Sequence, residues 1–332
     1  MAVYTTIDNS QEYFAVTTYT GNAAEAGDGS TQAITNVGHQ PNMLWFKKRS
    51  ATGNHHVVDS VRGRTKELRF NLTNAEADDD NLLVSFDSNG FTLGSSGSAN
   101  LNSATYVAWT WKESATSGFD IVSYTGNGAD RNIAHSLSAV PEWMIVKKRS
   151  GTDAGAVYLA ANGNTVALLI SETNANDDEL YWNDTTPTSS VFTLGGNISN
   201  ANTNGQTYIN YLWAPKQGFS RFGKYFGNAN ADGTFVYTGF KPAWVMIKRS
   251  STAGDNWLIH DIKRDGYNGA NKQLDADQNQ AEGNSRLIDM FSNGFKIIIN
   301  DAKINASGDT YQYMAFAESP FVNSNGVPNN AR

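Results

Sequence analysis

The sequence contains no cysteine and only seven prolines among its 332 residues. The absence of cysteine excludes disulfides, thiolate metal sites and cysteine nucleophiles, and it leaves the redox compartment open. Charged residues make up 17% of the chain, below the roughly 25% that is usual in soluble proteins. We therefore expect a polar but largely uncharged surface, built from the glycine, asparagine, serine and threonine that suit turns between strands.

The sequence lacks the patterns that are typical of several classes of function. The formal net charge of −7 argues against a basic groove for nucleic acid. No apolar run approaches the roughly 18 residues of a membrane span, and the N-terminus lacks the pattern of a secretory signal, so we expect a protein that is made in a cytoplasm and stays soluble. Nucleophile-elbow, phosphate-loop and dinucleotide patterns are also missing, so we predict no catalytic residues and no cofactor.

One phrase occurs three times along the chain. It reads "PNMLWFKKRS" at 41–50, "PEWMIVKKRS" at 141–150 and "PAWVMIKRS" at 242–250, a period of 100 and then 101 residues (141 − 41 and 242 − 141). An upstream "YTGN" or "YFGN" and a downstream strand that begins "TY" keep the same register. The predicted units are an N-terminal arm at 1–11, repeats at 12–116, 117–217 and 218–321, and a C-terminal tail at 322–332. We expect the arm and the tail to order only against neighbouring proteins.

The repeats have the sequence pattern of β-strands. "FAVTTYTG" and "TYVAWTW" alternate apolar and polar positions, as half-buried strands do. The repeated phrase is continuously apolar after its proline, which indicates a central strand covered on both faces. Helical periodicity is weak, with short candidates only at 73–81 and 275–283. We predict an all-β protein of three tandem β-sandwich, jelly-roll-like domains, each with its own core.

The strand predicted from the repeated phrase ends in basic residues on both faces. The first lysine after the apolar run stands at the same place in each repeat, at Lys47, Lys147 and Lys248. We favour the interpretation in which the strand leaves its covered region there and these lysines mark its exit into solvent. The alternative is a contact with an anion or a sugar acid, but no further motif converges on the lysines.

Acidic and basic residues follow a hydrophobic strand in the first and third repeats only. Asp59 and Arg62 stand in "VVDSVRG", and Asp261 and Arg264 stand in "LIHDIKRDG", whereas the second repeat reads "VYLAANG". Two interpretations are open, a buried ion pair that orders a loop and a contact with a ligand or partner. We favour the ion pair, because buried polar groups need partners whether or not a ligand is bound.

Two tryptophans stand in polar stretches, Trp182 in "YWNDTTPT" and Trp257 in "GDNWLIHD". Aromatic residues exceed what three small cores need, and exposed rings are a common contact for sugars and for partner proteins. We therefore predict that these two are exposed and contact a ligand or partner. The histidines and the contiguous acids at 78–80 lack the spacing of a zinc or calcium site, so we predict no metal.

Three segments carry a resemblance to a known family. They read "GFDIVSYTGNG", "DSVRGRTKELRFNLTNAEADDDNLLVSFDSNGFTLG" and "FVYTGFKPAWVMIKRSSTAGDNWLIHDIKRDGYN". They resemble an uncharacterised repeat domain of virion proteins from tailed phages, especially phages of marine and cyanobacterial hosts. The resemblance extends over about residues 14–321, although the second repeat lacks the "DSVRG" segment. The family has no known catalytic residues, so the resemblance implies a structural protein of the particle, with a tail fibre or surface appendage as the usual role.

The residues and the resemblance together predict a non-enzymatic virion protein that is assembled in the host cytoplasm. We expect it to contact other virion proteins, to form a homo-oligomer, with a trimer as the habit of such proteins, and to recognise a glycan or protein of the host surface. A purely architectural role, as a decoration or cement protein of capsid or tail, is the alternative. A polysaccharide depolymerase is a third, since it would need only two facing carboxylates.

Overall fold

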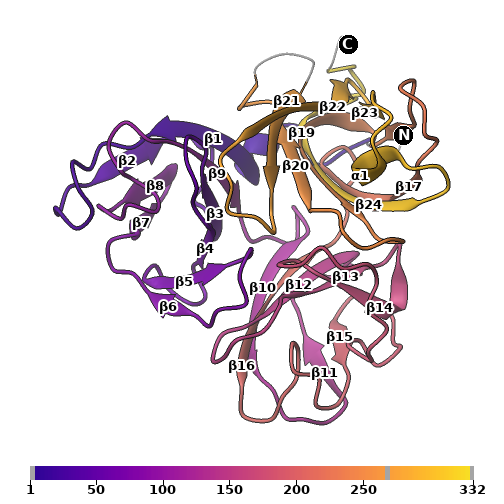
Figure 1. The fold of residues 1–332 in the computed structure, drawn as a ribbon, viewed down its shortest axis with the longest axis horizontal. Coiled ribbons are helices and arrows are strands. Elements are labelled where there is room, and N and C mark those ends of the chain that lie inside the picture. The colour runs from indigo at the N-terminus through magenta and orange to yellow at the C-terminus, as the bar shows by residue number, and fades with distance from the viewer. Residues whose placement is uncertain (1–3, 266–269, 330–332) are drawn as a thin grey trace.

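The computed structural model describes residues 4–265 and 270–329 as a nearly all-β protein. Its strands form several separate antiparallel sheets, which agrees with the prediction of an all-β, sandwich-type fold. Figure 1 shows three lobes arranged around a common centre. The lobes follow the three sequence repeats in chain order, and both chain ends lie at the third lobe.

The first repeat contains nine strands. They are β1 (Phe14–Thr20), β2 (Gln32–Thr35), β3 (Met43–Lys48), β4 (His55–Asp59), β5 (Lys66–Arg69), β6 (Ala77–Asp78), β7 (Leu83–Asp87), β8 (Gly90–Leu93) and β9 (Thr105–Trp111). Six of them form a large sheet in the order β1-β9-β3-β4-β5-β6, and the other three form a small sheet in the order β2-β8-β7.

The second repeat has the same plan with fewer strands. They are β10 (Phe119–Thr125), β11 (Arg131–Ala134), β12 (Trp143–Lys148), β13 (Ala156–Leu159), β14 (Gly163–Leu169), β15 (Val191–Leu194) and β16 (Thr207–Trp213). The large sheet has the order β10-β16-β12-β13-β14, and β11 pairs with β15 to form the small sheet.

The third repeat joins its strands into one sheet. They are β17 (Ser220–Phe226), β18 (Phe235–Tyr237), β19 (Phe240–Arg249), β20 (Leu258–Asp261), β21 (Ala270–Asp275), β22 (Gly283–Phe291), β23 (Gly294–Ile297) and β24 (Thr310–Pro320). The order is β17-β24-β19-β20-β21-β22-β23-β18, and a short helix, α1 (Ala302–Asn305), precedes β24.

The strand of the repeated phrase lies inside its sheet in every repeat, as β3, β12 and β19. The prediction of a doubly covered strand is confirmed, because all residues from Met43 to Lys47 are buried. Successive side chains of a strand point to opposite faces. Leu44 and Phe46 accordingly face the core of the first lobe, whereas Met43 and Trp45 face the centre of the molecule.

The centre of the molecule is one hydrophobic core to which all three repeats contribute. The ring centroid of Trp244 lies 6.5 Å from that of Trp45 and 6.1 Å from that of Trp111, and Trp111 lies 6.0 Å from Trp213. The prediction that each repeat has its own core is therefore correct for one face of each large sheet. The opposite faces are buried only because the repeats pack on one another.

The "YTGN" phrase marks a close approach of two backbone segments. A Cβ atom on Gly21 would lie 2.3 Å from the carbonyl oxygen of Leu101, so no other residue fits there. The next residue, Asn22, donates its backbone N–H to Oδ1 of the buried Asn100 over 3.0 Å. Both features recur, with Gly126 and Asn202 in the second repeat and Gly227 and Asn305 in the third. The phrase is therefore a structural landmark.

The prediction of short helices at 73–81 and 275–283 is wrong. The first segment is extended into β6, and the second leaves β21 without becoming helical. The backbone N–H of Glu76 donates to the carbonyl oxygen of Arg149, and that of Glu282 donates to Arg49. These N–H groups thus donate to carbonyl oxygens of another repeat, whereas in a helix they would donate to carbonyl oxygens of their own segment.

The N-terminal segment packs against its own chain, which corrects the expectation of an arm that orders only against other proteins. Ile7 is buried in the central core. The hydroxyl of Tyr4 donates to the carbonyl oxygen of Gly239 over 2.6 Å. The backbone N–H of Ser324, in the expected tail, donates to Oδ1 of Asp8 over 2.7 Å. Residues 1–3 and 330–332 of the arm and the tail lie outside the described residues.

The shared core predicts that the three repeats unfold together. Trp244→Ala removes a ring that contacts rings of the first repeat, and we expect a loss of about 3–5 kcal/mol in the free energy of unfolding. Urea unfolding should remain one transition by tryptophan fluorescence and by circular dichroism. Phe192→Ala, in the core of the second lobe, is the matched control and should also act on that single transition. A separate early transition of the third repeat in Trp244→Ala would contradict the shared core.

Candidate functional site

The three lysines of the repeated phrase are buried, which corrects the prediction that they mark an exit into solvent. Nζ of Lys47 donates to the carbonyl oxygen of Gln280, in the third repeat, over 2.7 Å. Nζ of Lys147 donates to the carbonyl oxygen of Leu72, in the first repeat, over 2.9 Å. Lys248 bonds to a carbonyl oxygen of its own repeat. Two of the three lysines therefore join one repeat to another.

Burial also changes the acid–base behaviour of these lysines. Removal from water disfavours the charged ammonium and lowers the pKa of all three to about 8. Near neutral pH the ammonium group is still the main form, and it satisfies carbonyl oxygens that would otherwise be buried without a donor.

Two residues further along, an arginine forms a bidentate ion pair with a neighbouring repeat. Arg49 of the first repeat binds Glu282 of the third, with Nε 2.8 Å from Oε2 and Nη2 3.0 Å from Oε1. Arg149 of the second repeat binds Glu76 of the first, with corresponding distances of 2.9 and 3.0 Å. Both glutamates are nearly buried, so solvent weakens these pairs less than it weakens an exposed pair.

The residues Asp59 and Arg62 extend the contact between the first two repeats. Their side chains are fully buried, with Nε of Arg62 2.5 Å from Oδ2 of Asp59. Arg62 also lies 3.2 Å from Glu76, and the hydroxyl of Tyr211, in the second repeat, donates to Asp59 over 2.6 Å. The partner that this predicted site contacts is therefore a neighbouring repeat of the same chain.

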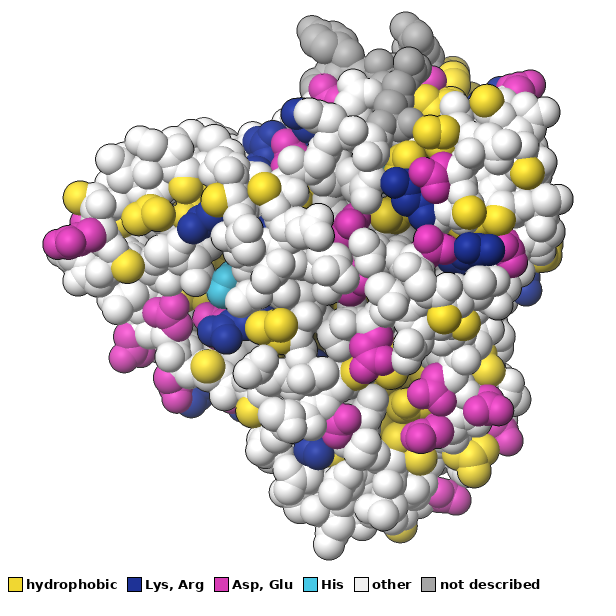
Figure 2. Space-filling view, in the orientation of Figure 1, with side chains coloured by type: hydrophobic (Ala, Val, Ile, Leu, Met, Phe, Trp, Pro, Cys, Tyr) yellow, Lys and Arg dark blue, Asp and Glu magenta, His cyan; other side chains and the backbone are white. Residues whose placement is uncertain are grey.

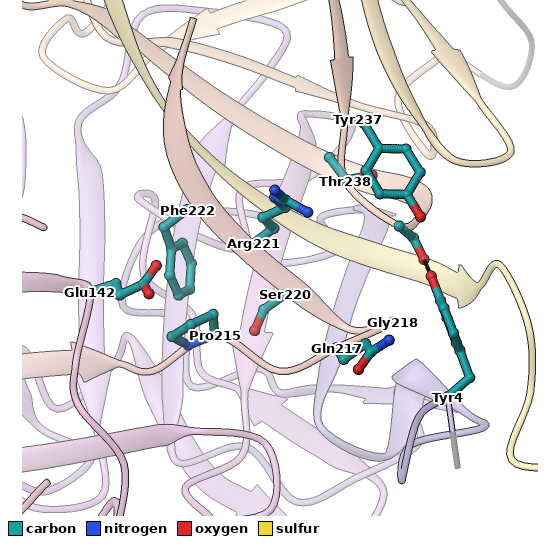
Figure 3. A pocket seen from close by; sticks show the side chains of 11 residues that line it. Tyr4, Glu142, Pro215, Gln217, Gly218, Ser220, Arg221, Phe222, Tyr237 and Thr238 are labelled. Carbon is teal, nitrogen blue, oxygen red and sulfur yellow. Dashed lines mark hydrogen bonds between the residues drawn. The ribbon is translucent and has the colours of Figure 1, made fainter. Parts of the chain in front are cut away.

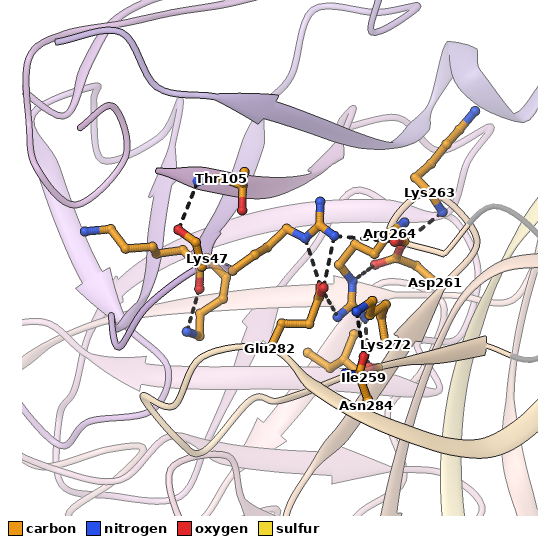
Figure 4. Close-up of polar contacts among 12 residues, drawn as sticks. Lys47, Thr105, Ile259, Asp261, Lys263, Arg264, Lys272, Glu282 and Asn284 are labelled. Atoms are coloured by element: carbon orange, nitrogen blue, oxygen red, sulfur yellow. Dashed lines mark hydrogen bonds and ion pairs between the residues drawn. The ribbon is translucent and has the colours of Figure 1, made fainter. Parts of the chain in front are cut away.

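Asp261 and Arg264 repeat this arrangement between the third and first repeats (Figure 4). Nε of Arg264 lies 2.5 Å from Oδ2 of Asp261, and its Nη1 lies 3.2 Å from Glu282. Trp109 of the first repeat donates its indole N–H to Asp261 over 3.1 Å, at the strand position that Tyr211 holds in the second repeat. We call these two sets the 1–2 junction and the 1–3 junction. The 1–2 junction comprises Asp59, Arg62, Glu76, Arg149 and Tyr211, and the 1–3 junction comprises Asp261, Arg264, Glu282, Arg49 and Trp109.

The 2–3 junction has no charged residue at any of these positions, which lie within the described chain. Strand register and backbone hydrogen bonds identify the equivalent residues as Leu159, Asn162, Asn176, Ser250 and Met314. An amide network takes the place of the ion pairs. Nε2 of Gln312 donates to Asn162 over 3.1 Å and to Ser250 over 3.2 Å, and Asn162 donates to Asn176 over 2.7 Å.

Trp182 and Trp257 are buried, so the prediction that they are exposed is wrong. The indole N–H of Trp182 donates to the carbonyl oxygen of Val166 over 3.1 Å, and the ring packs in the core of the second lobe. The indole N–H of Trp257 donates to Leu169 of the second repeat over 3.0 Å, and the ring lies in the central core. Each indole has a backbone partner, so polar neighbours in the sequence did not indicate exposure.

The surface carries few charges, as its composition predicts. Figure 2 shows uncharged side chains and backbone over most of one face, with acidic and basic side chains in small separate groups. Across residues 4–265 and 270–329, no three histidine, aspartate or glutamate side chains converge as a metal site requires. In the same residues no helix has both the length and the apolar character of a membrane-spanning helix.

A cleft of about 430 Å³ lies where the second and third repeats meet the N-terminal segment (Figure 3). Glu142, which precedes β12, forms one side. Arg221 and Phe222 of β17 form the floor, and Tyr237 of β18 and Tyr4 lie at the far side. The guanidinium of Arg221 lies 5.7 Å from the ring centroid of Tyr237, within range of a cation–π contact.

The cleft contains groups of opposite charge. Partial burial raises the pKa of Glu142, and the positive charge of Arg221 opposes that rise. Burial and a hydrogen bond with Tyr237 raise the pKa of Tyr4, so its hydroxyl keeps its proton at neutral pH. The site thus offers one carboxyl group, one guanidinium and neutral hydroxyls, an arrangement suited to binding a polar uncharged molecule.

Sequence reasoning missed both the junction residues and the cleft. The junction partners from different repeats are separated by more than 70 residues in the sequence, but one signal was present. Glu76 and Arg149 recur as Glu282 and Arg49, and both positions lose their charge together, as Asn176 and Ser250. A signal for the cleft was Tyr237, which stands where the first repeat has Thr35 and the second has Ala134.

The chain belongs to the family described as a domain of unknown function, DUF7483, whose model matches residues 9–320. No curated protein matches the chain.

The pKa of the buried lysines predicts how stability depends on pH. Each has a pKa of about 8 in the folded chain against 10.5 in its unperturbed state, so the unfolded chain binds more protons between these values. Stability of the wild type should therefore rise from pH 8 to pH 10, relative to the variant Lys47→Met/Lys147→Met/Lys248→Met. Urea unfolding at both pH values measures the difference, with Lys48→Met as a control. A difference that does not change with pH would show that the lysines keep an ordinary pKa.

The junctions predict that replacing all the charged residues of one junction together costs less stability than replacing one of them alone. Asp59→Asn leaves Arg62 buried without its main partner, and we expect a loss of about 3–5 kcal/mol. Asp78→Asn, in an exposed pair with Lys66, should cost under about 1 kcal/mol.

The set of substitutions that gives the 1–2 junction the residues of the 2–3 junction should recover most of the loss. It consists of Asp59→Leu, Arg62→Asn, Glu76→Asn, Arg149→Ser, Ile209→Gln and Tyr211→Met. Urea unfolding of the three variants and the wild type measures this. If the full set is at least as damaging as Asp59→Asn, the two junction types are not equivalent solutions.

Proposed function

We propose that the chain is a non-catalytic structural protein of a virus particle, of the tailed-phage kind that its sequence resembles. The observation that carries the proposal is the use of its charged residues. The carboxylates and guanidinium groups that recur in the repeats, which a catalytic site would need exposed to substrate, are buried against one another between the repeats.

The architecture is compatible with a long-lived, exposed component. Three lobes packed on one core form a block in which the repeats have little freedom to move separately. A surface with few charged groups limits the effect of salt on the molecule and on its contacts. We place the protein at a fibre, tip or surface appendage, where it contacts other virion proteins, assembles as a homo-oligomer and meets the host surface.

Localisation in the particle tests this proposal. Antibodies raised against the purified chain, followed by gold labelling of particles from a producing culture, should mark the distal end of the tail. Peptides of the chain should be found by mass spectrometry in the same purified particles. Labelling of the capsid or along the tail would overturn the host-facing role in favour of a decoration or cement protein. Absence of the chain from purified particles would overturn the structural role altogether.

A further inference from the structure

The third repeat exposes three aromatic side chains on two neighbouring strands. Phe226 on β17 is 58% exposed, and Phe235 and Tyr237 on β18 are 44% and 47% exposed. Strand pairing identifies the equivalent positions in the other repeats, because Phe226 pairs with Thr310 as Thr20 pairs with Thr105. None of these positions is aromatic there. They are Thr20, Ala33 and Thr35 in the first repeat and Thr125, Asn132 and Ala134 in the second.

Tyr237 lines the cleft described above, and Phe235, two residues before it on β18, points to the same face of that strand. Arg221, in the floor of the cleft, lies against Tyr237, and at the other end Oγ1 of Thr234 donates to the carbonyl oxygen of Phe226 over 2.8 Å. The two strands therefore run side by side in opposite directions. Arg221 and Phe226 are five residues apart on the regular strand β17, so their side chains point to opposite faces and Phe226 lies apart from the cleft. We call the exposed surface of Phe235 and Tyr237 the aromatic strip.

The chemistry of the cleft complements that of the strip. Glu142 supplies a carboxyl acceptor, Arg221 supplies guanidinium donors, and Gln217 supplies an amide that both donates and accepts. Hydroxyl groups of a sugar donate and accept hydrogen bonds, so they suit a wall of this mixed kind. The C–H faces of a sugar ring are apolar and cover aromatic rings without leaving polar groups buried.

We propose that the cleft and the aromatic strip form one binding site for a short, neutral oligosaccharide. One sugar unit occupies the cleft between Glu142 and Arg221, and further units lie along the strip. The opposite charges in the cleft balance, and the chain has a net charge of −7, so a polyanionic glycan is disfavoured. In the proposed function the chain contacts the host surface, and this site identifies the contacted molecule as a neutral glycan. The biological role of the site rests on that proposed function, whereas binding of the sugar does not.

The first test uses the purified full chain and a defined set of probes. Linear oligosaccharides of glucose, galactose and mannose, together with an acidic oligogalacturonate, are titrated by saturation-transfer NMR and calorimetry. At least one neutral probe should bind, and the acidic probe should bind more weakly. Absence of any neutral binding at about 10 mM, a concentration that detects even millimolar affinity, would overturn the proposal. Tighter binding of the acidic probe would overturn it as well.

The second test locates the site with residues that the chain itself uses elsewhere. Phe235→Asn/Tyr237→Ala gives the strip the residues of the second repeat, and Glu142→Gln removes the carboxyl group of the cleft. Each variant should weaken binding at least about 10-fold while the melting temperature stays close to that of the wild type. Arg131→Gln, on the equivalent edge of the second repeat, is the matched control and should bind normally. Unchanged binding in the double variant would overturn the assignment. Because these measurements need no particle, they can fail while the proposed structural role stands, and the reverse also holds.

Discussion

The packing of three sheet faces on one aromatic core is the constraint on which the rest of the structure depends. Each large sheet has two apolar faces, and a single repeat can cover only one of them with its own lobe. The other face, which carries Trp45 in the first repeat and Trp143 in the second, would be exposed in an isolated repeat. Hydrophobic burial at the centre therefore requires all three repeats at once, and the polar contacts between repeats are placed around that requirement.

Polar groups at the rim of the shared core become buried when the sheets pack together, so they need hydrogen-bond partners there. In the first and second repeats, the lysine of the repeated phrase donates to a carbonyl oxygen of another repeat. In the first and third repeats, the aspartate that ends the next strand accepts a phenol O–H or an indole N–H from another repeat. Removing such a group from water is costly unless its partner is already in place. The ion pairs thus form as a consequence of correct packing of the repeats, and burial of the apolar faces supplies most of the free energy of that packing.

Sequence reasoning found what is local and missed what is brought together by the fold. The continuous apolar run of the repeated phrase indicated a strand covered on both faces, which is what β3, β12 and β19 are. It could not show that a neighbouring repeat covers the second face. The burial of Lys47 had no local signal, because its acceptor Gln280 is 233 residues away. Trp257 stood among polar residues, and its partner is a carbonyl group of another repeat. The cleft combines Tyr4, Glu142 and Arg221, which no spacing rule connects.

The uneven distribution of charge among the junctions also specifies which repeat docks on which. Each repeat has one outgoing position, occupied by Arg49, Arg149 or Ser250, and one receiving position, occupied by Glu76, Asn176 or Glu282. Only one arrangement matches every arginine with a glutamate of another repeat and the serine with the asparagine: the first repeat on the third, the second on the first, and the third on the second. The mirror order would bury an arginine against an asparagine and leave a glutamate beside a serine. These differences between the three related repeats thus fix the order in which they pack around the centre, which three identical repeats could not specify.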